Sequence, residues 1–436
     1  MKFKYNLNDI PPFPELVLFG LQWLAIAVPT IIIIGNVVSG LQPGDPFFRI
    51  NYLQKLFFLT AVILLAQITL GHRLPLITGP AAVLLAGITA SQGTSTASIY
   101  TAIITGGLAL FILSATGLFS RLKNSFTPRV VATILILIAL TLTPLILNLI
   151  VGPGTSTTPL ANLLFALSFV ILMFVANRFL RGIWKSTLII WAIIAGTLAY
   201  YALFPETHLV YTQNLNPVSL FFKDLNYNLT FEPGVIISFM ICFLALSIND
   251  LGSIQSLGEL IQPDNMPQRI TRGISITGLA NVLSGFMGVI GPVNFSLSPG
   301  VIASTSCASR FTLIPAGIFL LALSFFPSVI SIIGSVPSVV TGTVLIYIMC
   351  SQISAGLMLA FNPTTGFKFD NGLVMGLPLM LGIVISFLPG DVLNTFPPAL
   401  RPVMGNGFVV GVLSVLIMEH IIFKEQKNTD KKALTQ

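Results

Sequence analysis

The chain has 436 residues, of which 54% are hydrophobic and only 8% are charged, and its formal net charge is +7. A water-soluble domain carries roughly a quarter charged residues, so this composition excludes an ordinary soluble globular protein. The lysines and arginines are scattered singly between apolar runs, which argues against a nucleic-acid-binding surface. The mean hydropathy of +0.93 instead predicts an integral membrane protein.

Apolar runs long enough to cross about 30 Å of hydrocarbon recur along the whole chain. They predict an all-α membrane protein with about fourteen spans. In chain order the predicted spans cover residues 16–38, 52–71, 78–91, 97–118, 128–151, 159–178, 184–204, 233–255, 272–290, 295–306, 311–333, 337–360, 372–389 and 404–423.

The third and tenth of these spans are short and lie beside Gly-Pro pairs. The pairs are Gly79-Pro80 and Gly291-Pro292. Because proline lacks a backbone N–H and disrupts helices, we expect both spans to be interrupted near the middle of the bilayer. Simple kinks between longer helices are the alternative.

The distribution of basic residues predicts the orientation in the membrane. Fourteen spans put both termini on one side, and 17 of the 21 lysines and arginines fall on that side. The exceptions are Arg49, Lys55, Lys223 and Arg401. By the positive-inside rule, both termini are expected in the cytoplasm, with the multi-pass chain in a cell membrane. The compact loops favour a bacterial inner membrane.

The two halves of the chain resemble each other. One span opens with Pro128-Arg-Val-Val and another with Pro337-Ser-Val-Val, 209 residues later, while the two Gly-Pro pairs are 212 residues apart. Seven spans per half is an odd number, so the second repeat is expected to be inverted. Inverted repeats with interrupted spans in matching positions are typical of secondary transporters.

Enzymatic chemistry is not indicated. The sequence holds no GxxxxGK phosphate-binding loop and no His-Ser-Asp or His-Cys constellation. Its three cysteines all lie in apolar runs without paired spacing. We therefore expect neither an enzyme nor an ATP-driven pump, and no cofactor or metal site.

The starts of the two short spans are candidate ligand sites. A helix that begins inside the membrane presents backbone N–H groups and the positive end of its dipole, which suit carbonyl oxygens or an anionic group. The residues at these starts are Ala81 and Ala82 in the first half, and Phe295, Ser296, Leu297 and Ser298 in the second.

Asp250 is an acid inside a predicted span. Carboxyl groups are costly at that depth, so it is a candidate for binding or for ion coupling. The amide of the adjacent Asn249 can both donate and accept hydrogen bonds, which suits an amide-like edge of a ligand. The alternative is that Asp250 accepts backbone N–H groups and only braces the protein.

Gln22 and Trp23 lie in the first span, the counterpart of the eighth. A buried amide needs a partner, and an indole can stack on a flat ring, so both are candidate ligand contacts. Packing within the protein is an equal alternative. His72 and His420 fall at predicted span ends, where we expect contact with lipid headgroups.

Several motifs together resemble the nucleobase–ascorbate transporter family, which includes the uracil and xanthine permeases. They occur in the family's order along nearly the whole chain. They are Gly20-Leu-Gln-Trp23, Leu74-Pro-Leu-Ile-Thr-Gly-Pro80, Phe126-Thr-Pro-Arg-Val-Val131, Arg272-Gly273 with Gly278, Gly285 and Gly288, and Gly300-Val-Ile-Ala-Ser-Thr305 with Ser309-Arg310.

This resemblance implies a homodimer in which a core domain moves against a gate domain like an elevator. It implies substrate between spans 3, 8 and 10, and uptake coupled to a proton or a sodium ion. The implied division is core 14–125, gate 126–204, an extracytoplasmic linker 205–232, core 233–335, gate 336–423 and a cytoplasmic tail 424–436.

The chain departs from the family at its site. Family members usually carry a glutamate where Asn249 stands and an Asp or His near Ser253, and some carry an acid where Thr277 stands. Anchored on Gly300, Leu297-Ser298 stands where the family has a Glu-Asn or Gln-Asn pair, in a tenth-span motif that is one residue shorter. The resemblance thus makes Asn249 and Ser253 substrate candidates, with Asp250 and Thr277 candidates for ion coupling.

We therefore predict a secondary transporter for a nucleobase-like solute of the uracil and xanthine class. An anion transporter of the sulfate-permease type is the first alternative, motivated by an acid-poor site between two helix starts. A membrane protein that binds a ligand without transporting it is the second.

Overall fold

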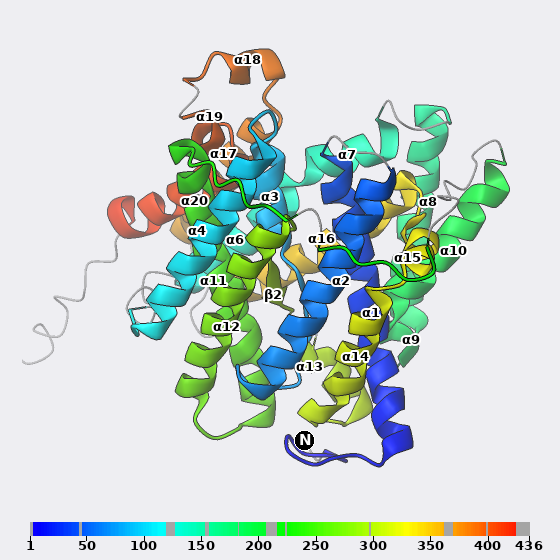
Figure 1. Cartoon of the computed structure of the whole chain (residues 1–436). Coiled ribbons are helices and arrows are strands. Elements are labelled where there is room, and N and C mark those ends of the chain that lie inside the picture. Colours follow the sequence, from blue (N-terminus) through cyan, green and yellow to red (C-terminus); the bar gives the residue numbers. More distant parts are fainter. Residues whose placement is uncertain are drawn as a thin grey trace, which may run out of the picture.

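The computed structural model describes residues 3–42, 46–118, 127–152, 157–181, 183–205, 216–222, 225–295, 298–361, 369–397 and 400–423. Nearly all regular structure in these ranges is helical, and most helices run between two opposite faces of the molecule (Figure 1). The amino terminus lies at one of these faces. The predicted tail 424–436 lies outside the described residues.

The first half of the chain runs from α1 to α10. Its elements are α1 (Phe13–Gly40), α2 (Pro46–Thr69), β1 (Thr78–Pro80), α3 (Ala82–Ala90), α4 (Thr96–Ala115), α6 (Pro128–Thr141), α7 (Thr143–Val151), α8 (Pro159–Phe179), α9 (Ile183–Ser186) and α10 (Leu188–Leu203).

The second half repeats this plan from α11 onward. Its elements are α11 (Pro233–Ile261), α12 (Met266–Met287), β2 (Pro292–Asn294), α13 (Ser298–Thr305), η2 (Arg310–Thr312), α14 (Leu313–Leu323), α15 (Pro327–Gly334), α16 (Ser338–Ala360), α17 (Phe369–Ser386), α18 (Gly390–Asn394), α19 (Arg401–Met404), α20 (Gly407–Ile417) and η3 (Met418–Ile422).

Each predicted span corresponds to one helix or to a broken segment. Within the described ranges eight helical segments are long and apolar enough to cross a membrane, or nine if the bent pair α14–α15 counts as one. The remaining predicted spans correspond to α12 (Met266–Met287), to the shorter apolar helices 188–203 and 407–422, and to the strand–helix pairs β1–α3 and β2–α13.

The eleventh predicted span is not a single helix, which corrects the sequence prediction for 311–333. The segments Arg310–Leu323 and Pro327–Gly334 meet at 101°. Phe326 precedes Pro327, and a residue before proline is pushed out of the helical region; its φ of −107° and ψ of 81° agree. Proline then starts α15 at a position where no N–H is needed.

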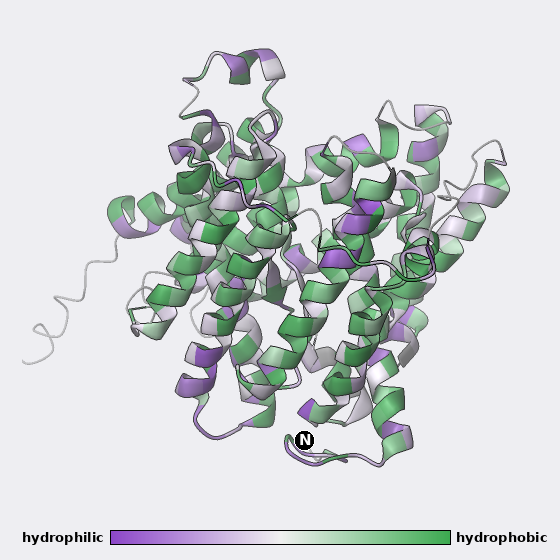
Figure 2. Cartoon of the chain, viewed as in Figure 1, coloured by the Kyte–Doolittle hydropathy of each residue, from purple (hydrophilic) through white to green (hydrophobic). Residues whose placement is uncertain are grey.

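Hydrophobic residues make up most of each long helix (Figure 2), and many of them are exposed. On α8, for example, Leu164, Leu167, Ile171 and Leu172 are all exposed. A soluble protein rarely exposes such a continuous apolar surface, but lipid solvates it well. The composition and the fold therefore agree on a membrane environment.

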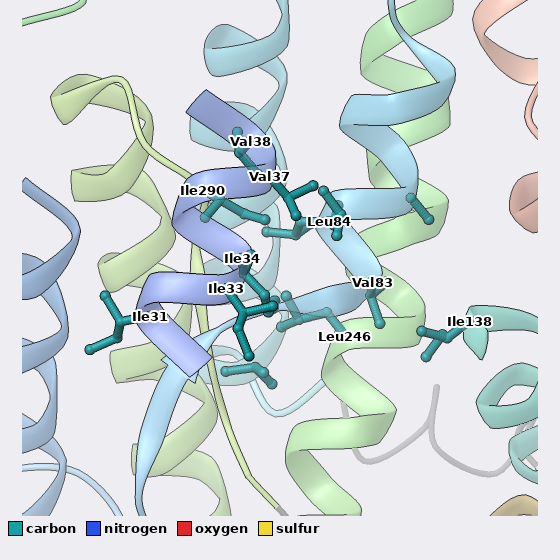
Figure 3. Close-up of a cluster of buried hydrophobic side chains, with 14 of the residues drawn as sticks. Ile31, Ile33, Ile34, Val37, Val38, Val83, Leu84, Ile138, Leu246 and Ile290 are labelled. Atoms are coloured by element: carbon teal, nitrogen blue, oxygen red, sulfur yellow. The ribbon is translucent and has the colours of Figure 1, made fainter. Parts of the chain in front are cut away.

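The half-helix α3 is packed inside the protein. Figure 3 shows Ile33, Ile34 and Val37 of α1 beside Val83 and Leu84 of α3, with Leu246 of α11 close by. These side chains are all at most 6% exposed. Because protein surrounds α3, its broken backbone is kept away from lipid.

Glycines allow α4 and α12 to pack closely. A Cβ atom added at Gly278 would lie 2.6 Å from the backbone nitrogen of Phe111, and one added at Gly285 would lie 2.6 Å from the carbonyl oxygen of Tyr100. Neither position has room for a side chain, as at other close helix contacts in membranes. The glycine pattern noted in the sequence is thus a packing requirement.

Candidate substrate site

The two interrupted spans meet in a short antiparallel ladder. Thr78 pairs with Asn294, Gly79 with Val293, and Pro80 with Pro292. The Ala81 nitrogen donates to the Gly291 carbonyl oxygen at 2.9 Å, which extends the ladder by one bond. Both Gly-Pro pairs therefore lie at extended segments that precede half-helices. The interruption is confirmed, and the alternative of simple kinks is wrong.

The ladder ends where the half-helices begin. Ala81 is the N-cap of α3 and supplies no side-chain cap, so the start of this helix is not satisfied by its own cap residue. On the other half, Ser298 is fully buried at the start of α13, and its hydroxyl accepts from the Ile77 nitrogen at 3.1 Å. Ser298 therefore ties α13 to the strand segment of the first half.

Phe295 covers the ladder on one side. A Cβ atom added at Gly79 would lie 2.5 Å from Phe295 Cζ and 3.4 Å from the Thr30 hydroxyl of α1. The half-buried Phe295 ring thus rests directly on the Gly79 backbone. The predicted candidates Ser296 and Leu297, which follow it, lie outside the described residues.

Asp250 lies on α11 and is fully buried against β2. Its Oδ1 atom accepts from the Asn294 backbone nitrogen at 3.2 Å and from Asn294 Nδ2 at 2.6 Å. The neighbouring Oδ2 atom has no hydrogen-bond partner among the described residues. One carboxylate oxygen therefore braces the broken span, while the other is buried and unpaired. The alternative that Asp250 only braces the protein therefore accounts for Oδ1 but not for Oδ2.

Asn294 links Asp250 to His72. His72 Nε2 lies 3.2 Å from Asn294 Oδ1, and His72 Nδ1 accepts from the Leu74 backbone nitrogen at 3.0 Å. Because Nδ1 accepts, the ring proton is on Nε2, which donates to Asn294. The three side chains thus form a continuous buried chain of hydrogen bonds.

His72 is not in contact with lipid headgroups, so that prediction is wrong. The residue follows α2 in a turn, and its side chain is fully buried. Burial lowers the pKa of the His72 imidazole to about 3, so the ring is neutral at physiological pH. A neutral ring matches the two hydrogen bonds that it makes.

Ser253 and Thr277 make hydrogen bonds to residues around the Asp250 carboxyl group. Ser253 is one turn after Asn249 on α11, and its hydroxyl donates to the Asn249 and Asn294 carbonyl oxygens at 2.9 and 3.0 Å. Thr277 of α12 lies beside the Asp250 carboxyl group, without completing a hydrogen bond to its Oδ2 atom, and accepts from Gln67 Nε2 at 3.0 Å. Both are buried, so they act from inside the protein.

Buried acceptors without partners gather at the ladder. Besides Asp250 Oδ2, they include the Thr78 hydroxyl of β1 and Asn281 Oδ1 of α12, whose amide nitrogen donates to the Pro292 carbonyl oxygen at 3.0 Å. None of these three atoms has a hydrogen-bond partner in the described part of the chain. A bound polar ligand or water would satisfy such groups.

Asn249 and Ala82 are the partly exposed members of the predicted set on α11 and α3. The Asn249 side-chain amide makes no hydrogen bond to the residues that the structure describes, although its carbonyl oxygen accepts from Ser253. An amide without a hydrogen-bond partner among these residues is available to a ligand.

Gln22 and Trp23 are both buried in α1, at 7% and 3% exposure. The indole Nε1 of Trp23 donates to the Thr312 hydroxyl at 3.0 Å, which fixes the ring against η2. The structure therefore gives Trp23 a packing partner within the protein. Residues that could ligate a metal ion form no cluster of three or more in the described ranges.

Sequence reasoning missed Asn294 and the role of His72. Asn294 had one local signal, because it is an amide that directly follows Gly-Pro-Val in a broken apolar span. His72 had none, since its partner is 222 residues away in the chain. The pairing of residues from both repeats depends on the fold.

This arrangement defines a class of protein. Apolar helices that cross the molecule, two half-helices joined at an antiparallel ladder, and a buried carboxyl group beside that ladder are the features of a membrane permease. The chain belongs to the xanthine and uracil permease family, because the profile described as "Permease family" matches residues 14–390. The predicted resemblance is confirmed.

Named relatives cover nearly the same length. The chain is 24% identical to the xanthine permease of Bacillus subtilis (strain 168), over 94% of this chain and 93% of that one. It is 25% identical to a uric acid permease of the same organism, over 78% and 75% of the two chains. These relatives are permeases and not enzymes, in agreement with the sequence prediction.

Solved structures support the fold. The transmembrane domain of the cyanobacterial bicarbonate transporter BicA superposes with a TM-score of 0.64 at 16% identity, over 87% of this chain and 98% of that one. It shares the fold of two inverted seven-span repeats, so the predicted fold class is confirmed. At this identity the likeness concerns the fold alone.

Proposed function

We propose that this permease moves a purine of the xanthine and uric acid class across the cell membrane. The substrate would bind where β1–α3 and β2–α13 meet α11, with the Asn249 amide on its polar edge. Asn249 carries the proposal, because it is partly exposed and without a side-chain hydrogen bond beside this junction. The names of the relatives support the choice of substrate.

The chemistry of Asn249 suits a neutral nucleobase. An amide offers one acceptor and two donor hydrogens, and the N–H and C=O groups of a xanthine edge are complementary to both. The ring would lie near Phe295, whose half-buried side chain can contact a flat face. The half-helix start at Ala82 presents backbone N–H groups on the opposite half.

We further propose that transport is coupled to protons through Asp250. Its unpaired Oδ2 atom is the group that would take up the proton, while Oδ1 keeps its bonds to Asn294. Movement of a neutral carboxyl group through a low-dielectric environment costs far less than movement of a carboxylate. Sodium coupling is the other outcome, and Thr277 would then contribute an oxygen ligand.

The mechanism that we propose is a movement of a core unit against a gate unit in a homodimer. In support of this division, α12 packs along α4 and α11, whereas α16, α17 and α20 pack around α6. We place the termini in the cytoplasm, since most basic residues fall on that side of the predicted topology.

An anion carrier is the competing function, since BicA shares the fold. A carboxyl group beside the ladder argues against it, because a carboxylate would repel an anion. Binding of labelled xanthine to purified protein separates these functions. We expect saturable binding that uric acid displaces and bicarbonate or sulfate does not. Displacement by the inorganic anions alone would reject the proposed substrate class.

A further inference from the structure

A basic pocket lies at the carboxyl end of α2. This end of α2 is on the same face of the molecule as the amino terminus (Figure 1). The volume of the pocket is about 290 Å³, near the lower end for small-molecule sites. None of its lining residues belongs to the candidate substrate site. They are Ile68, Thr69, Arg73, Arg310, Phe311 and Ile314.

Three arginines meet around this pocket. Arg310 Nη1 donates to the Ile68 carbonyl oxygen and Arg73 Nε to the Thr69 carbonyl oxygen, both at 2.8 Å. Arg269 Nη1, from the first turn of α12, donates to the His72 and Arg73 carbonyl oxygens at 3.0 and 3.1 Å. The three guanidinium groups therefore converge on the carboxyl end of α2 and the turn that follows it.

The local negative charge is too small for three cations. A helix end carries about half an elementary charge, which one arginine already offsets. The ion pairs among the described residues are Lys4–Glu15 and Arg129–Glu419, and neither involves this cluster. Asp264 lies close enough to Arg269 to act on its charge, but Arg269 Nε donates to the Asp264 main-chain oxygen. A net positive charge remains at the pocket.

One donor in the pocket also lacks an acceptor. Arg310 Nε is buried and has no hydrogen-bond partner among the described residues, while the guanidinium lies 4.8 Å from the centre of the Phe311 ring. The Arg310 Nη1 group is satisfied by its hydrogen bond to the end of α2, whereas the Nε–H group has no acceptor among the residues described. A buried donor on a cation is costly unless an anionic oxygen completes it.

The remaining walls are apolar. Ile68, Phe311 and Ile314 line the pocket, and Leu70 beside it is 64% exposed. A ligand that fits must therefore combine an anionic oxygen group with hydrocarbon. At the end of membrane-spanning helices, that combination describes a phospholipid.

We propose that this pocket binds the phosphate of an anionic phospholipid, with Arg73 and Arg310 on the phosphate oxygens and the first acyl carbons against Ile314 and Phe311. Arginine suits this contact because its planar fork binds two phosphate oxygens at once. The lipid would hold the ends of α2 and α14 together at the membrane surface.

The test uses the purified full chain in detergent and counts bound lipid by native mass spectrometry. The probes are phosphatidylglycerol, phosphatidylcholine of the same chain length, and inorganic phosphate. We expect phosphatidylglycerol to bind preferentially. Each removed charge should weaken that binding about fivefold, in Arg73→Gln and in Arg310→Gln. The control Arg272→Gln removes an exposed arginine of α12 that does not line the pocket, and it should bind as the wild type does.

Both arginines donate to carbonyl oxygens at the end of α2, but Arg73 is exposed whereas Arg310 is partly buried, so Arg73→Glu is the decisive variant. It should abolish the preference for phosphatidylglycerol while the protein stays folded. Equal binding by Arg73→Glu and the wild type would overturn the proposal. Binding of inorganic phosphate without a lipid preference would overturn the identification of the ligand as a lipid.

Discussion

Two neighbouring side chains on α11 have opposite surroundings. Asp250 is fully buried and holds Asn294, whereas Asn249 is partly exposed and holds nothing through its amide. Adjacent helical residues point about 100° apart, so one can serve the interior of the protein and the other a ligand. This difference leads to separate predictions for the two residues.

Replacing Asn249 should weaken substrate binding without affecting the fold. In Asn249→Leu the polar edge of the bound xanthine loses its partners, at a cost of about 1–3 kcal/mol, or roughly 5- to 150-fold in Kd. Equilibrium binding of labelled xanthine measures this loss. Ser256→Leu, an exposed position on the same helix, is the matched control. Unchanged affinity in Asn249→Leu would remove this residue from the site.

Asp250→Asn should uncouple transport from the pH gradient. An asparagine can still accept from Asn294 through its side-chain oxygen, so the brace on β2 survives and the protein folds. Exchange of labelled for unlabelled xanthine should persist in proteoliposomes, while accumulation driven by an imposed pH gradient should be lost. Gradient-driven accumulation at the wild-type rate would show that another group carries the proton.

His72 should make the protein less stable in acid. Its folded pKa of about 3 lies below the ordinary value of 6.5, so the folded state favours the neutral ring. Stability is therefore complete above about pH 6.5 and falls with pH, by about 2 kcal/mol at pH 5. The thermal midpoint in detergent at pH 7.5 and pH 5 measures this effect. His72→Gln should shrink the difference, and an equal difference in the variant would contradict the assignment.

At this scale the sequence identified single residues better than their partners. Asp250 was recognisable because a carboxyl group within an apolar run is costly wherever it points. Its contact with Asn294, 44 positions away, and the contact of Asn294 with His72 depend on how two repeats dock. Trp23 is a further example, because a buried indole requires a hydrogen-bond acceptor but the sequence does not show that this acceptor is Thr312.

At the scale of elements, the interrupted third and tenth spans were predictable. A short apolar run beside a Gly-Pro pair cannot form a full span, and its repetition 212 residues later removes the ambiguity. The break between α14 and α15 was not predicted, because Ser324-Phe-Phe-Pro327 lies inside an apolar run long enough for one span, where a proline is also compatible with a kinked helix. Hydropathy shows which segments can lie in lipid, but it does not show where such a segment bends.

The close contact between α4 and α12 should tolerate no added side chain. In Gly278→Ala the new Cβ would lie 2.6 Å from the Phe111 backbone nitrogen, so the helices must separate. We expect a loss of about 1–3 kcal/mol, seen as a lower thermal midpoint in detergent. Gly376→Ala on α17 is the control, because a Cβ there meets nothing within 4 Å. Equal thermal midpoints for the two variants would show that the contact between α4 and α12 does not limit the stability of the protein.

At the scale of the whole molecule, the fold and the candidate site carry different information about function. The inverted repeat is shared with the bicarbonate transporter BicA, so the fold alone does not select the solute. We propose that the solute is selected by the groups beside the ladder, which are the amide of Asn249, the carboxyl group of Asp250 and the ring of Phe295. The resemblance implies a glutamate where Asn249 stands, and we propose that the amide suits a neutral ligand edge.

Uptake of labelled xanthine into proteoliposomes, driven by a pH gradient that is acidic on one side only, tests this account most directly. We predict concentrative uptake that is abolished by a protonophore, competed by excess uric acid and unaffected by excess bicarbonate or sulfate. Uptake that fails with purines but proceeds with the inorganic anions would contradict it.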